Sequence, residues 1–567
     1  MTYGFKCGLL TASLIAFSFA ISAQAQNGNR LLGGLTGLVE SDRGTPLEGI
    51  MVQLIAKDSG IRTTVYSHAD GHYEFPKLAA GTYLLRIALP REYLPYVKPS
   101  VTIDGPSRLD DIVLKRVTET TVVPPASGAT VQGAAVTKTI EPALLPPSTW
   151  MASQLSGAEW LMSLPGTAEE KQVFSYQCNL CHSFQQVFRS RFDEDGWRKV
   201  VYRMTHGIGS PLINLSPVSN ISDHNENLLV NWLARVRGPN SPDAPLFAFP
   251  RPKGRSTDAI ITEYELPRLE IATHDVAGDA NGNIWYSTHR SSWIGRLDPR
   301  TGKVTQYHIP LSPAPAAPGT HWIHVDPFGI VWASENWAHD MVRLDPKSGD
   351  IKKIPWPTAQ QQLNTPMGGN YAMDPQGFIW DCRNGMVRKV DPRTAKVVMS
   401  YPTKKFPSTY GSAMSADGRY FGGGAWPNDG VVVVDTKTGE VFEPSTSPDS
   451  GPSRGEFDPQ GNYWSGGRGG PLVEFDTTNH VIREFYPPTP YGKLYTAVAD
   501  KNGEIWAGNL QAGRYLRFNP KTEQFTEYLL PEPYAHDREP WIDNSTNPVS
   551  VWHVDHEGYI VHIQPLQ

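Results

Sequence analysis

The sequence of 567 residues predicts a mainly β, multidomain protein with an N-terminal β-sandwich, a small α-helical domain and a C-terminal seven-bladed β-propeller. Three observations predict this class. Short strand candidates separated by Gly, Pro and Asp fill residues 31–116. Apolar residues at helical spacing follow in residues 151–240. From residue 255 to residue 567, a unit with the length of a propeller blade recurs.

The composition agrees with a turn-rich β protein. The chain has 51 Gly, 49 Pro, 16 Trp and 23 Tyr, and charged residues make up only 19%. The net charge of −6 is mild, and the sequence shows neither a basic surface for nucleic acid nor a polybasic patch for a membrane. We therefore expect no nucleic-acid partner.

The N-terminus has the pattern of a secretory signal peptide over residues 1–25. Lys6 precedes an apolar run over residues 8–20 that is too short to span a bilayer, and Ala23-Gln24-Ala25 is a small-x-small cleavage site. The alternative is a retained N-terminal anchor, which the cleavage site disfavours. No other run is long enough to cross a membrane, so we expect a periplasmic protein with no membrane span after cleavage.

The first folded unit, residues 31–116, is predicted to be a β-sandwich. Its strand candidates are residues 35–40, 51–56, 63–67, 73–75 and 83–88. The Asp70-Gly71 pair is a tight-turn signal before a strand, and we interpret His68 and His72 beside it as exposed loop residues. Residues 117–150 are rich in Pro, Ala, Thr and Val and are predicted to be an extended linker.

Several short segments of this unit follow one another in a characteristic order. They are Gly-Leu-Val at 37–39, Pro-Leu-Glu-Gly-Ile at 46–50, Asp-Gly-His-Tyr-Glu-Phe at 70–75 and Ala-Gly-Thr-Tyr at 80–83. In order and spacing they resemble the carboxypeptidase regulatory-like (transthyretin-like) domain. The resemblance implies no catalysis. It implies a spacer, a docking module or a module that contacts a carbohydrate ligand.

Residues 178–182 read Cys178-Asn179-Leu180-Cys181-His182, which is the attachment motif of a c-type haem. The two thiols add across the porphyrin vinyl groups, and the adjacent His supplies an axial nitrogen to the iron. Zinc needs four ligands, and no second Cys pair exists here; a redox dithiol needs a βαβ context that is missing. The sequence therefore predicts one covalent haem c on Cys178 and Cys181, with His182 as iron ligand.

Two helical stripes follow the motif inside residues 151–240. Apolar residues lie at 197, 200, 201 and 204, and again at 228, 229, 232, 233 and 236. The segment from Trp197 to Gly207 resembles the Trp-x-x-(apolar)-x-x-x-Met-x-x-Gly segment of small bacterial c-type cytochromes. The resemblance implies that Met204 is the distal iron ligand and that the domain transfers electrons. The alternatives are core packing of Met204, ligation by His206 or an open sixth position.

The repeated unit begins with Asp-x-x-Gly-x-(aromatic or apolar)-Trp, first at residues 279–285. The turn glycines lie 41 to 55 residues apart, at positions 282, 329, 377, 418, 461, 503 and 558. A repeat of this length with four strands is typical of a propeller blade. The last copy lacks its outer strand, and residues 260–267 resemble the outer strand at 525–531. A ring closed by strands from both ends has no exposed sheet edge, which predicts seven blades over residues 255–567.

The sequence pattern of these blades resembles that of the virginiamycin B lyase (streptogramin lyase) family over residues 260–567. For activity, the resemblance implies a magnesium-assisted elimination with a Glu and a His near the central channel, and hence Mg²⁺ at the propeller. The sequence does not single out which Glu and His these are. Generic blade motifs also occur in unrelated propellers, so the fold does not fix the function.

Candidate pocket residues come from the innermost strand before each turn and from the loop after each Trp. They are His274, His321, His324, Glu335, His339, Arg383, Arg454, Arg468 and His553. Arginine forks suit carboxylates, and His titrates near neutral pH, so the set predicts an anion-binding pocket at one mouth of the ring. The alternative for each residue is a purely local role in its loop. No catalytic residue is assigned.

Three functions fit these observations. The first is a periplasmic oxidoreductase whose propeller binds a small-molecule substrate or a partner, while the haem exchanges electrons with a periplasmic donor or acceptor. The second is a carbon–oxygen lyase with an accessory haem. The third is a non-enzymatic redox or carbohydrate-binding protein. The haem motif favours the first function, because an elimination needs no electron carrier. The N-terminal region has no Gly-x-Gly-x-x-Gly flavin fingerprint.

Overall fold

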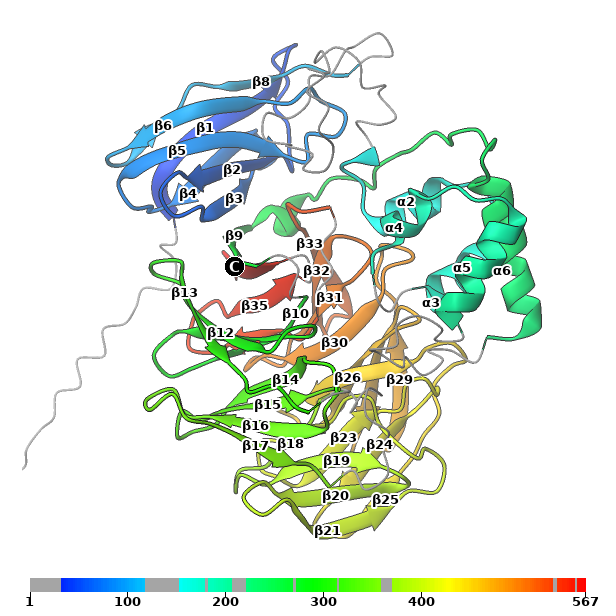
Figure 1. The fold of residues 1–567 in the computed structure, drawn as a ribbon. Coiled ribbons are helices and arrows are strands. Elements are labelled where there is room, and N and C mark those ends of the chain that lie inside the picture. The colour runs from blue at the N-terminus through cyan, green and yellow to red at the C-terminus, as the bar shows by residue number, and fades with distance from the viewer. Residues whose placement is uncertain are drawn as a thin grey trace, which may run out of the picture.

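The computed structural model describes residues 32–117, 152–178, 182–205, 221–268, 272–313, 316–357, 370–533, 538–555 and 558–567. The predicted signal peptide and nearly all of the predicted linker lie outside these residues. Within them, no helix combines the length and the apolar character needed to span a bilayer. Figure 1 shows a β-sandwich in blue, a group of helices in cyan and green, and a ring of sheets running from green to red.

The N-terminal unit has two sheets. One contains β1 (Leu32–Ser41), β4 (His72–Pro76), β7 (Ser107–Arg108) and β8 (Ile112–Leu114), and the other contains β2 (Met51–Ala56), β3 (Arg62–Tyr66), β5 (Gly81–Ala88) and β6 (Val97–Ile103). Alternate residues of both sheets point inward and bury Val39, Val52, Leu54 and Phe75. The predicted β-sandwich is therefore present.

The sandwich is joined to the ring by main-chain hydrogen bonds. Strand β9 (Ala259–Glu265) pairs with β3 of the sandwich on one side and with β36 (Tyr559–Pro565) of the ring on the other. The result is one sheet of eight strands that runs through both units. The sandwich is consequently a fixed part of the fold, in contrast to the separate spacer that the family resemblance implies.

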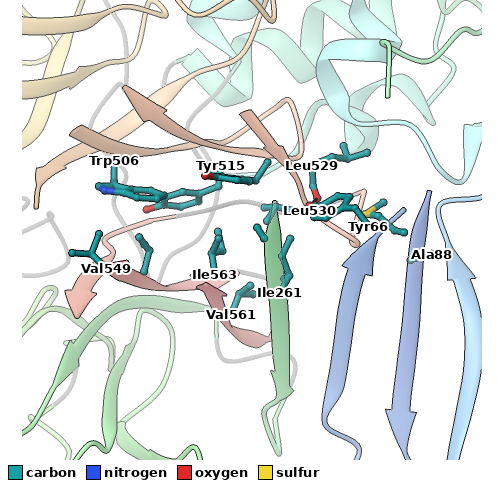
Figure 2. Packing of buried hydrophobic residues seen from close by; sticks show 14 of the residues in the cluster. Tyr66, Ala88, Ile261, Trp506, Tyr515, Leu529, Leu530, Val549, Val561 and Ile563 are labelled. Carbon is teal, nitrogen blue, oxygen red and sulfur yellow. Dashed lines mark hydrogen bonds between the residues drawn. The ribbon is translucent and has the colours of Figure 1, made fainter. Parts of the chain in front are cut away.

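Apolar side chains seal this junction. Figure 2 shows Tyr66 and Ala88 of the sandwich beside Ile261, Leu529 and Leu530 of the ring, and all five residues are buried. The Tyr66 hydroxyl donates a hydrogen bond of 2.5 Å to the carbonyl of Leu529. A buried apolar contact with a satisfied hydroxyl fixes the angle between the two units.

The turn beside this junction corrects one expectation from the sequence. His72 is exposed as predicted, whereas His68 is half-buried against the short helix η1 (Gly254–Thr257). A ring nitrogen of His68 lies 3.3 Å from Thr257 Oγ1 and 3.6 Å from a carboxylate oxygen of Asp258. The loop holding His68 therefore contacts the segment that leads into the ring.

Five helices form the described part of the middle unit. They are α2 (Gly157–Ser163), α3 (Ala168–Gln177), α4 (Phe184–Phe188), α5 (Glu194–Thr205) and α6 (Asp223–Val236). Capping boxes start α2 at Ser156 and α3 at Thr167, where each hydroxyl accepts from the backbone three residues on. Aromatic rings of Phe174, Phe188 and Trp232 pack together in the core.

The stripe predicted on α5 is only partly buried. Trp197 and Val201 lie in the core and Val200 is half-buried, but Met204 is 54% exposed. Core packing, which was one alternative for Met204, is therefore wrong. The thioether remains accessible at the last turn of α5.

Seven four-stranded antiparallel blades form the ring within the described residues; the fifth and sixth pair with each other in one sheet of eight strands, and the seventh continues into the sandwich. The first three are β10 (Thr273–Gly278), β11 (Ile284–Thr288), β12 (Trp293–Asp298) and β13 (Lys303–His308); β14 (Thr320–Val325), β15 (Val331–Glu335), β16 (Asp340–Leu344) and β17 (Ile351–Pro355); and β18 (Ala372–Met373), β19 (Ile379–Arg383), β20 (Met386–Asp391) and β21 (Lys396–Pro402). The next two are β22 (Ala413–Met414), β23 (Tyr420–Gly424), β24 (Val431–Asp435) and β25 (Glu440–Phe442); and β26 (Pro452–Phe457), β27 (Tyr463–Gly467), β28 (Leu472–Asp476) and β29 (Val481–Phe485). The last two are β30 (Leu494–Ala499), β31 (Ile505–Asn509), β32 (Arg514–Asn519) and β33 (Gln524–Leu529); and β34 (Trp541–Asp543), β35 (Ser550–Asp555), β36 and β9. Strand β9 covers the predicted closing strand, so both ends of the propeller sequence build the seventh blade.

The repeated Asp and Trp have a shared structural role. In the first blade, one oxygen of Asp279 accepts from the turn backbone, and the other accepts from the indole N–H of Trp285 at 2.9 Å. Equivalent bonds join Asp326 to Trp332, Asp374 to Trp380, Asp458 to Trp464 and Asp500 to Trp506. The carboxylate thus satisfies both the turn and the ring, which explains why the two residues recur at fixed spacing.

Candidate functional site

Four of the innermost strands each contain a β-bulge, and residues of these bulges form the site. The pairing register shifts between Thr273 and Val276 in β10, and equivalent shifts occur near the start of β14, β26 and β30. Such a bulge turns side chains away from the alternating pattern of a strand and often lies next to a functional site. The residues inside these four bulges include His274, Asp275, His321, Arg454 and Tyr495.

These residues meet in a buried cluster around Arg454, which is fully enclosed. Its Nη1 lies 2.9 Å from an oxygen of Asp275 and 3.2 Å from an oxygen of Glu539. Its Nη2 lies 2.7 Å and 3.1 Å from the two ring nitrogens of His321. The lone pairs of those nitrogens diverge, so an atom this close to both lies over the ring.

His274 connects the cluster to a pair of tyrosines. Its Nδ1 lies 2.6 Å from Asp275 Oδ1, and its Nε2 lies 3.4 Å from the hydroxyl of Tyr495. The hydroxyl of Tyr495 in turn lies 2.6 Å from that of Tyr410. This arrangement is a continuous series of hydrogen-bonding groups that starts at a carboxylate and ends at a phenol.

Three imidazole rings converge beside Arg454. The ring centre of His274 is 3.9 Å from that of His321 and 4.9 Å from that of His289. Burial lowers the pKa of all three residues, and the nearby arginine charges lower it further; for His289 the pKa falls to about 3. All three imidazoles are therefore neutral at pH 7, and the lowered pKa makes each a weaker base than a free imidazole.

Two more arginines lie among the aromatic rings of the cluster. The guanidinium carbon of Arg468 is 4.9 Å, 4.2 Å and 4.7 Å from the ring centres of Tyr410, Trp426 and Tyr495. That of Arg538 is 4.8 Å from the ring centre of Tyr495. Together with Arg454, these side chains make the cluster a cationic and aromatic environment.

Four of the nine predicted pocket residues lie together, namely His274, His321, Arg454 and Arg468. The other five have contacts elsewhere. His324 stacks on Trp322, Glu335 pairs with Lys353, the backbone N–H of His339 donates to the carbonyl of Glu335, Arg383 lies over the ring of Tyr371, and His553 stacks on Tyr515. The structure therefore brings together four of the nine predicted residues, whereas the contacts described for the other five lie outside this cluster.

Sequence reasoning missed Asp275, His289, Tyr410, Tyr495, Arg538 and Glu539. Four of the six, Asp275, His289, Tyr410 and Tyr495, lie at positions within the repeat that predicted residues of the cluster also occupy. His274, His321, Tyr410 and Tyr495 each lie five residues before the first residue of a turn, and Arg454 and Asp275 lie four before it. His289 and Arg468 each lie four residues after a blade Trp. A fixed offset within the repeat thus marks the residues that reach the cluster, which residue chemistry alone did not reveal.

The haem-binding segment predicted from the sequence lies on this face of the propeller. The side-chain oxygen of Gln511 accepts from the backbone N–H of Phe184 at 2.9 Å, and its carbonyl accepts from that of Ala158 at 2.7 Å. A Cβ atom on Gly451 would lie 3.4 Å from the hydroxyl of Tyr176 and 3.6 Å from Cβ of Arg468. Tyr176, two residues before Cys178, is therefore next to the arginine of the cluster.

The described residues of the motif fit a covalent haem. Cys178 caps α3 and is partly accessible. Nδ1 of His182 is 3.0 Å from the carbonyl of Ser183, which leaves Nε2 for the iron. Metal-bound His side chains usually donate their second nitrogen in this way. Met204 presents an accessible thioether. Cys181 and the rival ligand His206 lie outside the described residues.

A metal at the propeller has one candidate group within the part of the chain that the structure describes. Ligand atoms of His274, Asp275 and His321 all lie within 4.8 Å of one another. The guanidinium of Arg454 already contacts Asp275 and His321. A second cation at this point would face that charge directly, so the group does not fit Mg²⁺, which also prefers oxygen ligands.

Comparison with known proteins adds the following. Residues 34–115 match the family of carboxypeptidase regulatory-like domains. A solved streptogramin B lyase is similar at 19% identity and a TM-score of 0.47, covering 55% of this chain and 100% of its own. A selenomethionine-substituted virginiamycin B lyase from Staphylococcus aureus is similar at 19% identity and a TM-score of 0.46, covering 54% and 99%. A search of curated proteins found no match.

Proposed function

We propose that the chain is a periplasmic c-type haem oxidoreductase that binds its substrate in the buried cluster of the propeller. In this proposal Cys178 and Cys181 hold the haem, while His182 and Met204 are the iron ligands. A haem with a His and a Met ligand exchanges one electron at a comparatively high potential. The proposal leaves the periplasmic partner that exchanges electrons with it unnamed.

The observation that carries the proposal is the position of the motif segment on the propeller. Gln511 binds the backbone of Phe184, two residues after His182, and Tyr176 lies against Gly451 beside Arg468. Electron transfer requires a short distance between donor and acceptor. A haem-binding segment on the face that carries the cluster meets this requirement, whereas a freely tethered domain would not.

The cluster contributes groups suited to binding and proton transfer. Arg454, Arg468 and Arg538 favour a negatively charged substrate group. His274, oriented by Asp275, presents Nε2 as the proton acceptor, and the charge of a bound anion would raise its pKa, which burial lowers in the free protein. If the substrate gives one electron to the ferric haem and one proton to His274, the charge of the substrate itself is unchanged.

A screen of haem reduction tests the proposal. Oxidised protein is mixed with small organic acids, and the haem absorbance is followed for conversion of ferric to ferrous iron. We expect reduction by one chemical class, with a rate that falls at least tenfold in His274→Ala and not in the matched variant His324→Ala. A protein whose haem is reduced by no class, although it binds haem, would be a carrier or a sensor instead of an enzyme.

A lyase is the second candidate, and the pair of His274 and Asp275 favours it, because an elimination also needs a base. The two functions differ in their electron balance. A lyase would form an unsaturated product with the haem remaining in its starting oxidation state. Product analysis by mass spectrometry alongside the absorbance screen separates them.

A further inference from the structure

Two atoms at the centre of the cluster have no hydrogen-bond partner among the described residues. They are Oδ2 of Asp275, an acceptor, and Nε of Arg454, a donor. Both side chains are completely buried. An unsatisfied group of this kind is costly inside a protein and calls for a bound molecule. A molecule that satisfies both must offer one acceptor and one donor.

The charges around Asp275 determine which molecule fits. Nη1 of Arg454 and Nδ1 of His274 both contact Oδ1 of Asp275, at 2.9 Å and 2.6 Å. Burial raises the pKa of Asp275 to about 7, but the two donors on Oδ1 favour the ionised carboxylate, whose second oxygen is an acceptor. It therefore requires a donor, and a hydroxyl is a donor that adds no further positive charge beside Arg454.

The arginine side of the cluster requires an acceptor. Nε of Arg454 is the donor without a partner, and Arg468 and Arg538 add positive charge close by, since all three approach the ring of Tyr495 within 4.8 Å. A carboxylate satisfies a guanidinium N–H better than a neutral acceptor does. A bound metal ion would instead add another positive charge next to Arg454.

The cluster also reaches solvent. The side chain of Glu539, which bonds Arg454, is 14% exposed, and His289 is half-buried at the edge of the three imidazoles. The exposed Arg290 follows His289 directly. A small anion approaching from this side meets a basic residue before it meets the buried groups.

We propose that the cluster is a binding site for a small hydroxycarboxylate, whose carboxylate accepts from Nε of Arg454 and whose hydroxyl donates to Oδ2 of Asp275. The inference rests on the proposed function in that it assigns a ligand class to the same site. It concerns binding alone, so it is measurable without electron transfer. The hydroxyl distinguishes this class from simple carboxylates, and the carboxylate distinguishes it from alcohols.

Calorimetric titration of the full-length protein tests this assignment with three probes of similar size. Lactate has both groups, propionate lacks the hydroxyl and 2-propanol lacks the carboxylate. We expect lactate to bind at least tenfold more tightly than propionate, and 2-propanol not to bind. Equal affinity for lactate and propionate, or no binding of lactate, overturns the inference.

Two variants locate the binding. Asp275→Asn keeps the size of the side chain but replaces the anionic acceptor, so the preference for lactate over propionate should disappear. Glu335→Gln, outside the cluster, is the matched control and should retain it. Circular dichroism and the thermal midpoint establish that Asp275→Asn is folded; if it is not, His274→Gln serves as the second variant and should also reduce the preference.

The remaining outcomes are also informative. Titration with Zn²⁺ that binds one ion per chain and is lost in His321→Ala would replace the hydroxycarboxylate with a metal and overturn the inference. Tight, Asp275-dependent binding of lactate without any haem reduction would retain the inference and contradict the proposed oxidoreductase. The two proposals therefore fail separately.

Discussion

The guanidinium of Arg454 and the carboxylate of Asp275 meet at 2.9 Å although 179 residues separate them in the chain. Both side chains are removed from solvent. One comes from a bulge in the fifth blade and the other from a bulge in the first blade, so the pair joins opposite parts of the ring. The charge of Arg454 lowers the pKa of Asp275, which burial raises to about 7, and the charge of Asp275 raises the pKa of Arg454.

Removal of Arg454 should therefore destabilise the propeller strongly. Arg454→Met leaves Asp275 as a buried carboxylate without its counter-charge, which typically costs about 3–5 kcal/mol. We expect a markedly lower thermal midpoint in differential scanning calorimetry. The control is Arg300→Met, which removes an arginine that is largely exposed on Asp298 and should leave the midpoint unchanged. Equal midpoints for the two variants would contradict a central structural role for Arg454.

The haem prediction is tested by covalent retention. Protein exported to the periplasm should keep its haem through denaturing electrophoresis, because thioether bonds survive the detergent. Cys178→Ala should weaken or abolish the haem stain, whereas Cys382→Ala, which removes the buried cysteine of the third blade, should not change it. One zinc ion per chain in place of haem would show that the motif has another role.

Met204 is tested by spectroscopy. The oxidised protein should have a sulfur-to-iron charge-transfer band, and Met204→Ala should remove the band and lower the potential, because a thioether ligand favours ferrous iron. Met162→Ala, on α2, replaces another exposed methionine and is the control. An unchanged spectrum in Met204→Ala would mean that His206 is the sixth iron ligand or that the sixth position is open.

Glu263 predicts a pH dependence of stability. Its carboxyl is fully buried where the sandwich meets the seventh blade, and Gln53 Nε2 donates to it at 3.0 Å. Burial raises the pKa of Glu263 to about 8, and the charge of Glu532 raises it as well. The folded state therefore holds this proton more tightly than the unfolded state does. Its contribution to stability is complete below pH 4.5 and is lost progressively as the pH rises towards 8.

Thermal midpoints measured between pH 5 and pH 9 test this dependence. Glu263→Gln cannot ionise and keeps the shape of the side chain, so its midpoint should fall less over this range and should exceed that of the parent protein above pH 8. Glu440→Gln, at an exposed position of β25, should follow the parent curve. Parallel curves for the parent protein and Glu263→Gln would mean that Glu263 is ionised throughout.

Gln511 tests the attachment of the motif segment to the propeller. Gln511→Ala removes the acceptor of the Phe184 N–H, a hydrogen bond of 2.9 Å that typically contributes about 1 kcal/mol. Amide hydrogen exchange should become faster over residues 182–188 while the blades remain protected. Gln524→Ala, on an exposed part of β33, should change neither region. Slow exchange in Gln511→Ala would show that other contacts suffice to hold the segment.

The sequence was most informative about repeated and local features. The Asp and Trp recur in five blades because one carboxylate bonds both a turn and an indole, and this bond is local enough to leave a pattern. The closing strand was visible because its sequence resembles another outer strand. The helical stripe of α6 was visible because burial follows the helical period there.

Other features depend on contacts between distant residues. The pairing of β3 with β9 joins segments about 200 residues apart, and neither strand carries a mark of its partner. The bulges of the innermost strands leave the apolar pattern intact and change only the direction of a few side chains, which is why Asp275 and Tyr495 were missed. The exposure of Met204 breaks a helical stripe that predicted burial.

The strand shared by the sandwich and the propeller limits how this chain can be divided. Strand β9 lies between β3 and β36, with both of its hydrogen-bonding edges occupied. Excision of the sandwich at its apparent boundary would leave the edge from Ile260 to Glu263 open to solvent, together with the buried carboxyl of Glu263. An unprotected edge recruits other strands, so an isolated propeller would self-associate or aggregate.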